Sequence, residues 1–135
     1  MTLFKSTFSL GFLALFCSIG CQNKKLNLPE LNTLDLLRGD IGLCGDPEFG
    51  EVKFSISCDY SVQETFDLAV SLLHSFEYDE AEKAFVKVID KDPDCTMAYW
   101  AIAMSRIRPN WGPKPEVFDE TRKLLKIAES LPKTS

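Results

Sequence analysis

Residues 62–95 read VQETFDLAVSLLHSFEYDEAEKAFVKVIDKDPDC, and this stretch decides the fold. It contains two stretches with helical periodicity, separated by a short break near the middle. Two antiparallel helices pack closely only where small residues meet, and Ala69 and Ala81 are such residues. Phe85 then fills the space between the helices, and Pro93 ends the second helix because proline cannot continue one. The stretch therefore predicts a helical hairpin.

A second, imperfect copy of this hairpin follows. A shift of 34 residues aligns the first helix with a third, for example Ser71 with Ser105, whereas the second helix matches a fourth only at a shift of 39. The difference is an insertion within RPNWGPKP (Arg108–Pro115), where three prolines and a glycine exclude a helix. We expect four helices, at about residues 62–76, 79–90, 94–107 and 116–130.

The spacing of these residues resembles the tetratricopeptide repeat (TPR), a helical hairpin of 34 residues. Ala81 and Phe85 match its Ala-x3-Phe element and Pro93 matches its stop, whereas Thr65 departs from the usual Trp. The resemblance implies a mainly α fold, an α-solenoid of two repeats at residues 62–95 and 96–132. The strings LHSFEYDEAEKAF and CTMAYWAIAMS are also similar to the N-terminal part of longer bacterial TPR lipoproteins, a group from which no biochemical activity carries over.

Residues 1–20 have the composition of a secretory signal peptide. Lys5 supplies a short positive start, and the apolar run that ends at Ile19 is too short to span a bilayer. It stops at Ser-Ile-Gly-Cys21, which resembles a bacterial lipobox with serine in place of the usual leucine. The resemblance implies that Cys21 carries lipid and that residues 21–29 tether the chain to the bacterial cell envelope, on the periplasmic or outer-membrane side. Ordinary signal cleavage without lipid is the alternative.

Residues 30–61 precede the repeats and differ from them in pattern. ELNTLDLLR, with leucines at helical spacing (Leu31, Leu34 and Leu37), predicts one or two helical turns. IGLC and EVKFSISC then flank a turn-rich segment, and the second string alternates apolar and polar residues. We expect a small β-hairpin here.

Export would place the remaining cysteines, Cys44, Cys58 and Cys95, in an oxidising compartment. The hairpin would bring Cys44 and Cys58 together, and we expect a disulfide between them, with Cys95 left as a thiol. Two free buried cysteines in the hairpin are the alternative.

No residues in the pattern of a known catalytic or cofactor site occur in the chain. The formal charge of −5 argues against a nucleic-acid partner, because no basic stripe is present to contact phosphates. His74 is the single histidine and has no fixed partner, so it is a weak candidate for a base. The cysteines lack the Cys-x2-Cys spacing of zinc sites. We expect no catalytic activity, no metal and no cofactor.

The candidate binding surface predicted from the sequence is apolar. In superhelical repeats of this type the first helix of each pair lines the concave face. Helical spacing puts one apolar stripe on that face: Phe66, Val70, Leu73, Met97, Trp100, Met104 and Ile107. The stripe either binds a protein or peptide partner or is covered by the chain's own residues 31–58. Methionines and a tryptophan suit an adaptable binding surface.

The fourth helix has apolar residues on more than one face: Val117, Phe118, Leu124, Leu125, Ile127 and Leu131. One face packs on the third helix, and the other has no cover within two repeats, so we expect self-association through residues 116–131 or a longer parent protein. The sequence favours an envelope-anchored scaffold that binds a protein or peptide and has no catalytic activity. The alternatives are the N-terminal fragment of a longer TPR enzyme or enzyme accessory, and a truncated fragment without function.

Overall fold

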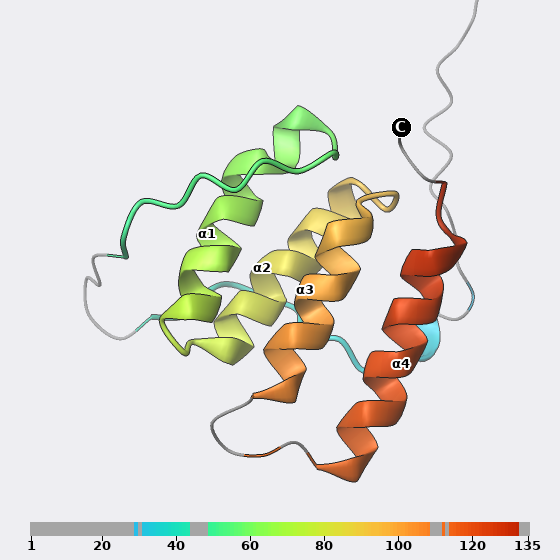
Figure 1. Ribbon diagram of the computed structural model, residues 1–135. Helices are drawn as coiled ribbons and strands as arrows, with labels where there is room; N and C mark the ends of the chain where they lie inside the picture. The colour runs from blue at the N-terminus through green and yellow to red at the C-terminus, as the bar shows by residue number, and fades with distance from the viewer. Residues whose placement is uncertain (1–28, 30, 44–48, 109–111, 113, 133–135) are drawn as a thin grey trace, which may run out of the picture.

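The computed structural model describes residues 29, 31–43, 49–108, 112 and 114–132. These residues form four helices and two short 3-10 turns: η1 (Leu31–Thr33), η2 (Tyr60–Val62), α1 (Gln63–His74), α2 (Tyr78–Lys91), α3 (Thr96–Ile107) and α4 (Pro115–Ser130). The helices run up and down, and each packs mainly on the next one in the sequence (Figure 1). The predicted mainly α class is confirmed, and every predicted helix end lies within two residues of the observed one.

The interface between α1 and α2 depends on the small residues and the aromatic residue that the sequence singled out. Ala69 and Ala81 are fully buried, which lets the two helices approach closely. Phe85 is also fully buried, and its ring meets that of Phe66 edge to face at a centroid distance of 5.3 Å. The predicted position of Phe85 between the two helices is therefore confirmed.

The two interhelical connections differ in length and design. The short turn after α1 passes through Phe76, whose φ of 65° lies in the left-handed region. The longer connection after α3 begins at Arg108, with a φ of 45°, and ends at Pro115 in the first turn of α4. A proline is favoured there because the first turn leaves its N–H groups unpaired anyway. The predicted insertion thus separates α3 from α4, as expected.

The chain before the helices passes them twice. Residues 31–43 run behind the helices in the view of Figure 1, where the N–H groups of Leu37 and Gly42 donate to the carboxylates of Glu82 and Glu80 on α2. Residues 49–58 then return along α1. Helical turns predicted for residues 30–38 are reduced to η1, and Leu37 is exposed, whereas Leu34 and Leu36 are buried. Of the three leucines predicted at helical spacing, Leu34 is buried and Leu31 is partly buried, whereas Leu37 is exposed because the chain after Thr33 is not helical.

The predicted β-hairpin is not confirmed, since none of the described residues 41–43 and 49–58 lies in a strand. The alternation selects the correct side in part: Val52, Ile56 and Cys58 are half-buried and the polar residues between them are exposed. Phe54, on the apolar side of the pattern, is 45% exposed although its ring contacts Phe66. A period of two requires only an extended chain on an apolar surface, and here α1 supplies that surface in place of a second strand.

The predicted Cys44–Cys58 disulfide is also wrong, because Cys58 bonds to Cys95 instead. Cys95 is fully buried at the N-cap of α3, directly beside the end of the extended segment. Cys44 lies outside the described residues, as do the predicted signal peptide, Cys21 and all but the last residue of the tether. No helix in the described parts of the chain is both long and apolar enough to cross a membrane.

Candidate partner-binding groove

An apolar groove of about 400 Å³ lies between α1 and α3. Six of the seven residues predicted for a binding surface line it: Phe66, Val70, Leu73, Met97, Trp100 and Met104. The seventh, Ile107, lines a neighbouring polar cleft instead. These residues come from two helices whose first residues, Gln63 and Thr96, are 33 positions apart. They lie together because α2 reverses the chain between the two helices.

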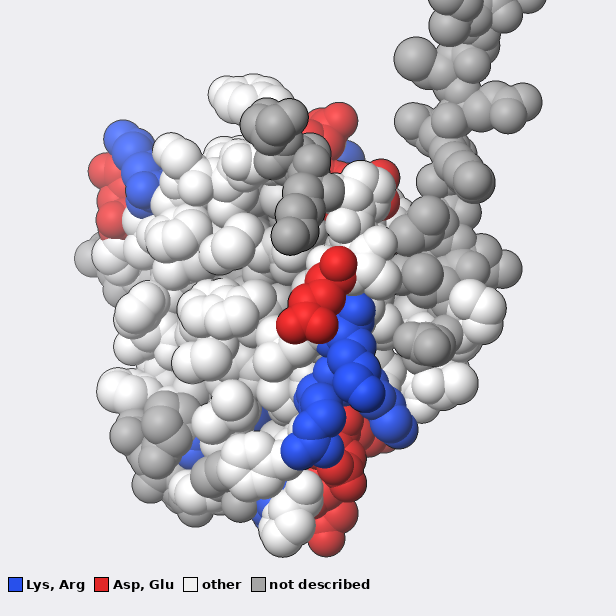
Figure 2. Space-filling model, turned by 45° about the vertical axis from the view of Figure 1, so that its right-hand side comes forward, with Lys and Arg blue, Asp and Glu red and all other residues white. Residues whose placement is uncertain are grey.

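The groove has a buried floor and an exposed rim. Phe66 is only 1% exposed, and Phe85 of α2 lies beneath it, so both belong to the floor. Trp100 is 45% exposed and Phe76 is 59% exposed, and these side chains stand at the rim. Figure 2 shows a broad area of this side of the molecule without charged side chains, next to a band of charged ones. Large apolar side chains exposed together in a concave surface are typical of binding sites.

The chain covers part of the groove with its own segment around Phe54. The ring of Phe54 packs on Phe66 with a centroid distance of 5.9 Å. Two side chains of α1 hold its backbone: Asp67 Oδ1 accepts a hydrogen bond from Phe54 N (2.9 Å), and Gln63 Nε2 donates one to Phe54 O (2.8 Å). Of the two sequence alternatives, covering is found in part: Phe54 covers Phe66, whereas Trp100 and Phe76, which line the same groove, remain exposed.

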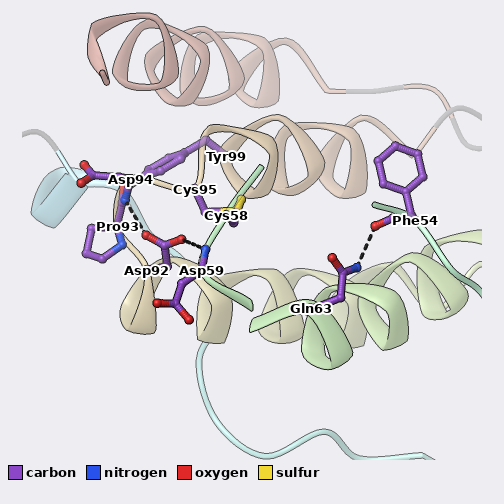
Figure 3. Close-up of a disulfide and its surroundings, with 9 residues drawn as sticks. All are labelled: Phe54, Cys58, Asp59, Gln63, Asp92, Pro93, Asp94, Cys95 and Tyr99. Carbon is purple, nitrogen blue, oxygen red and sulfur yellow. Dashed lines mark hydrogen bonds between the residues drawn. A yellow bond between two sulfur atoms is a disulfide. The ribbon is translucent and has the colours of Figure 1, made fainter. Parts of the chain in front are cut away.

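The disulfide anchors this covering segment to the start of α3 (Figure 3). Beside it, the carboxylate of Asp92 accepts hydrogen bonds from the backbone N–H groups of Asp59 (2.8 Å) and Asp94 (3.3 Å). Among the described residues, Cys58, Asp92 and Cys95 form a group whose potential metal-ligand atoms lie within 4.8 Å of one another. Both sulfurs are joined in the disulfide and are therefore not available as thiolate ligands.

Tyr99 closes the same corner. Its hydroxyl donates a hydrogen bond to the carbonyl of Pro93 (2.9 Å). Burial, together with the carboxylates of Asp94, Asp92 and Asp90, raises the pKa of Tyr99 to about 12. The phenol therefore stays protonated and remains a hydrogen-bond donor, which fixes the turn that leads into α3.

A polar cleft of about 790 Å³ lies next to the groove, among α2, the end of α3, the start of α4 and residues 35–42. Its lining contains more carboxylates (Asp35, Glu77, Asp79, Glu80, Glu82 and Glu120) than cations (Arg106, Arg108 and Lys114). Burial acts to raise the pKa of Glu80, but hydrogen bonds from Lys83 Nζ (2.7 Å) and the Gly42 N–H (2.8 Å) outweigh it, so this pKa lies below its ordinary value. Glu80 therefore remains ionised at neutral pH.

Arg106 is the centre of a buried ion network at the base of this cleft. Its guanidinium donates two hydrogen bonds to Glu82, at 3.1 and 2.6 Å, and one to Glu120 at 2.6 Å. It also donates to the backbone carbonyl of Asp35. The side chains of Arg106 and Glu82 are 8% and 5% exposed, so this pair is shielded from water. The network joins α2, α3, α4 and the N-terminal segment.

Sequence reasoning missed this network and the role of Phe54. A signal was present, because Glu82 lies on the same helical stripe as Tyr78, Ala81 and Phe85, where a charge needs a partner. Nothing in the spacing pointed to Arg106 as that partner, since the two residues are 24 positions apart.

His74 and Tyr78 are further residues of the groove that the stripe did not include. His74 is the last residue of α1 and is exposed at the surface. Comparison with known proteins finds no family model, no curated protein and no solved structure that matches this chain.

Proposed function

We propose that this protein is a TPR-type scaffold that binds an apolar segment of a partner protein in the groove between α1 and α3. The observation that carries the proposal is the uncovered part of the groove, a concave apolar surface lined by the exposed Trp100 and Phe76 and by Met104. Flexible methionines adapt to different ligand shapes, and an exposed tryptophan supplies a large apolar contact area. A groove of this kind binds a partner without chemical change, and the scaffold has no catalytic activity of its own.

Two features support the TPR assignment. The helices follow one another as antiparallel neighbours, with Ala69, Ala81 and Phe85 buried at the first interface. In the second pair, Leu124 is fully buried at the position that a shift of 39 aligns with Phe85. In a TPR array the first helix of each pair lines the concave side, which is the arrangement of α1 and α3 around the groove.

The binding proposal is tested with short fluorescein-labelled peptides that present leucine or phenylalanine anchors. Met104→Glu puts a carboxylate into the groove, and we expect it to weaken binding at least about tenfold, because an apolar ligand leaves that charge without water. Tyr60→Glu is the matched control, since Tyr60 is exposed and does not line the groove. In a Trp111→Phe background the fluorescence of Trp100 reports the same binding event directly.

The outcome that contradicts the proposal is equally plain. If Met104→Glu and Tyr60→Glu bind every peptide as tightly as the parent protein does, the groove is not the binding surface. Circular dichroism of both variants checks that the helices are intact, so a loss of binding by unfolding is recognised as such.

The envelope anchor is part of the same proposal. Cys21 follows an apolar run and small residues, the arrangement on which lipid attachment to the scaffold rests. Labelled palmitate incorporated into the parent protein but not into Cys21→Ala is the expected result. Equal labelling of the two would contradict the anchor and leave the groove unaffected.

A further inference from the structure

The apolar groove and the polar cleft share a wall. Phe76 and Tyr78 line both of them, and their rings meet edge to face at a centroid distance of 6.2 Å. Glu77 lies between these two residues in the sequence and lines the cleft. A bound segment that extends past this end of the groove therefore enters the cleft.

The cleft carries an excess of negative charge at that point. Arg106 pairs with Glu82 and Glu120, Arg108 pairs with Asp79, and Lys83 pairs with Glu80. Within the described part of the chain, Asp35 and Glu77 have no ion-pair partner.

Lys114 is the cation of the lining that forms no ion pair with another described residue. With Lys114 counted, the lining has three cations against six carboxylates, so negative charge remains in excess. The cleft thus complements a positive group.

We infer that the partner segment is amphipathic: apolar anchors that fill the groove are followed by a lysine or arginine that lies in the acidic cleft. The inference rests on the proposed function and adds the chemistry that distinguishes one apolar segment from another. Charge complementarity of this kind affects the choice of partner and the association rate more than the total affinity. The preference for a basic segment falls as salt is added, because mobile ions screen exposed charges.

The probe is a set of three fluorescein-labelled peptides with the same length. The first has two leucine anchors followed by two lysines, the second replaces the lysines with glutamates, and the third replaces the leucines with serines. For the parent protein at low salt we expect the lysine peptide to bind about tenfold more tightly than the glutamate peptide. The serine peptide is expected not to bind.

Two charge-reversal variants locate the effect. Glu77→Lys changes the cleft beside Phe76, and Glu129→Lys makes the same change of charge on an exposed residue of α4 that lines neither depression. We expect Glu77→Lys to remove most of the preference for the lysine peptide and to improve binding of the glutamate peptide. Glu129→Lys is expected to keep the preference of the parent protein.

The possible failures are distinguishable. If the leucine peptides bind, Met104→Glu abolishes that binding, and lysine and glutamate peptides bind equally well, then the groove functions and the acidic cleft does not select. An equal effect of Glu77→Lys and Glu129→Lys overturns the inference in the same way, because the preference then reflects net charge alone. If Met104→Glu changes nothing, the proposed function itself is wrong.

Discussion

The two helix pairs follow the same plan but are covered differently. A shift of 34 residues aligns Phe66 of α1 with Trp100 of α3. Phe66 is 1% exposed and contacts the ring of Phe54. Trp100 is 45% exposed, and no aromatic ring of the described residues is recorded against it. These equivalent positions in the two helix pairs therefore differ in exposure because Phe54, which precedes the helices, packs on Phe66.

The same comparison explains the buried ion network. At equivalent positions, Leu72 of α1 corresponds to Arg106 of α3, and Ala81 of α2 corresponds to Glu120 of α4. The first pair has a leucine and an alanine where the second has an ion pair of 2.6 Å. A charged pair replaces apolar packing here because Arg106 also holds the N-terminal segment through the carbonyl of Asp35.

Other positions are the same in both pairs. The hydroxyls of Ser71 and Ser105 each donate a hydrogen bond to the backbone carbonyl four residues earlier, at 3.2 and 3.0 Å. Both serines are buried, and their bond to the helix itself satisfies the polar group. The two helix pairs thus share features of their packing and differ in their contacts with residues 31–58.

The largest expected effect tests the shared packing. Phe85→Ala should lower the free energy of unfolding by about 3–5 kcal/mol, since it empties the space between α1 and α2. Leu124→Ala at the equivalent position of the second pair should cost about 2–5 kcal/mol. Denaturant unfolding measures both. A loss below about 1 kcal/mol for Phe85→Ala would mean that the two interfaces are not built alike.

The ion network gives the next largest effect. Glu82→Leu removes the bidentate partner of Arg106 and should cost about 3 kcal/mol, because breaking a buried pair leaves a charge with less compensation. Asp119→Asn is the control, as the Asp119–Arg122 pair is exposed and should contribute less than about 1 kcal/mol. Adding Arg106→Met to Glu82→Leu should restore part of the loss. Equal stability of Glu82→Leu and Asp119→Asn would show that the network does not stabilise the fold.

The disulfide tests how firmly the segment around Phe54 is held over Phe66. Cys58→Ser together with Cys95→Ser should cost about 2–4 kcal/mol, since the bridge no longer restricts the unfolded chain. Hydrogen exchange at the amide of Phe54 should accelerate more than exchange within α4, because only the covering segment loses its anchor. Peptide mapping without reduction checks the connectivity. A disulfide-linked peptide containing Cys44 and Cys58 would contradict the anchoring of the segment around Phe54 by Cys95.

The smallest effect on stability concerns the outer side of the second pair. Phe118 of α4 is 46% exposed, and Arg122, Lys123 and Lys126 are exposed as well. We propose that Phe118 contributes to self-association through residues 116–131. Phe118→Glu should shift the mass in analytical ultracentrifugation toward the monomer and change the unfolding free energy by less than about 0.5 kcal/mol. A parent protein that is monomeric at every concentration contradicts self-association.

Most of the fold could be predicted from the sequence, because it depends on the local period of apolar residues and on prolines that mark helix boundaries. Helical spacing identified all four helices, and Pro93 and Pro115 lie at their boundaries. The same spacing identified six residues of the groove, since the side chains that face one way on α1 and α3 follow directly from the helix period.

The sequence by itself determined the four helices, the buried positions of Ala69, Ala81 and Phe85, and the apolar stripe of the groove. Only the tertiary structure decided which cysteine bonds to Cys58, which cation pairs with Glu82, and that Phe54 covers part of the groove. Periodicity describes which side of an element is apolar, but it contains no information about which distant segment arrives there. That choice depends on the path of residues 31–58 around the helices, which no repeat in the chain encodes.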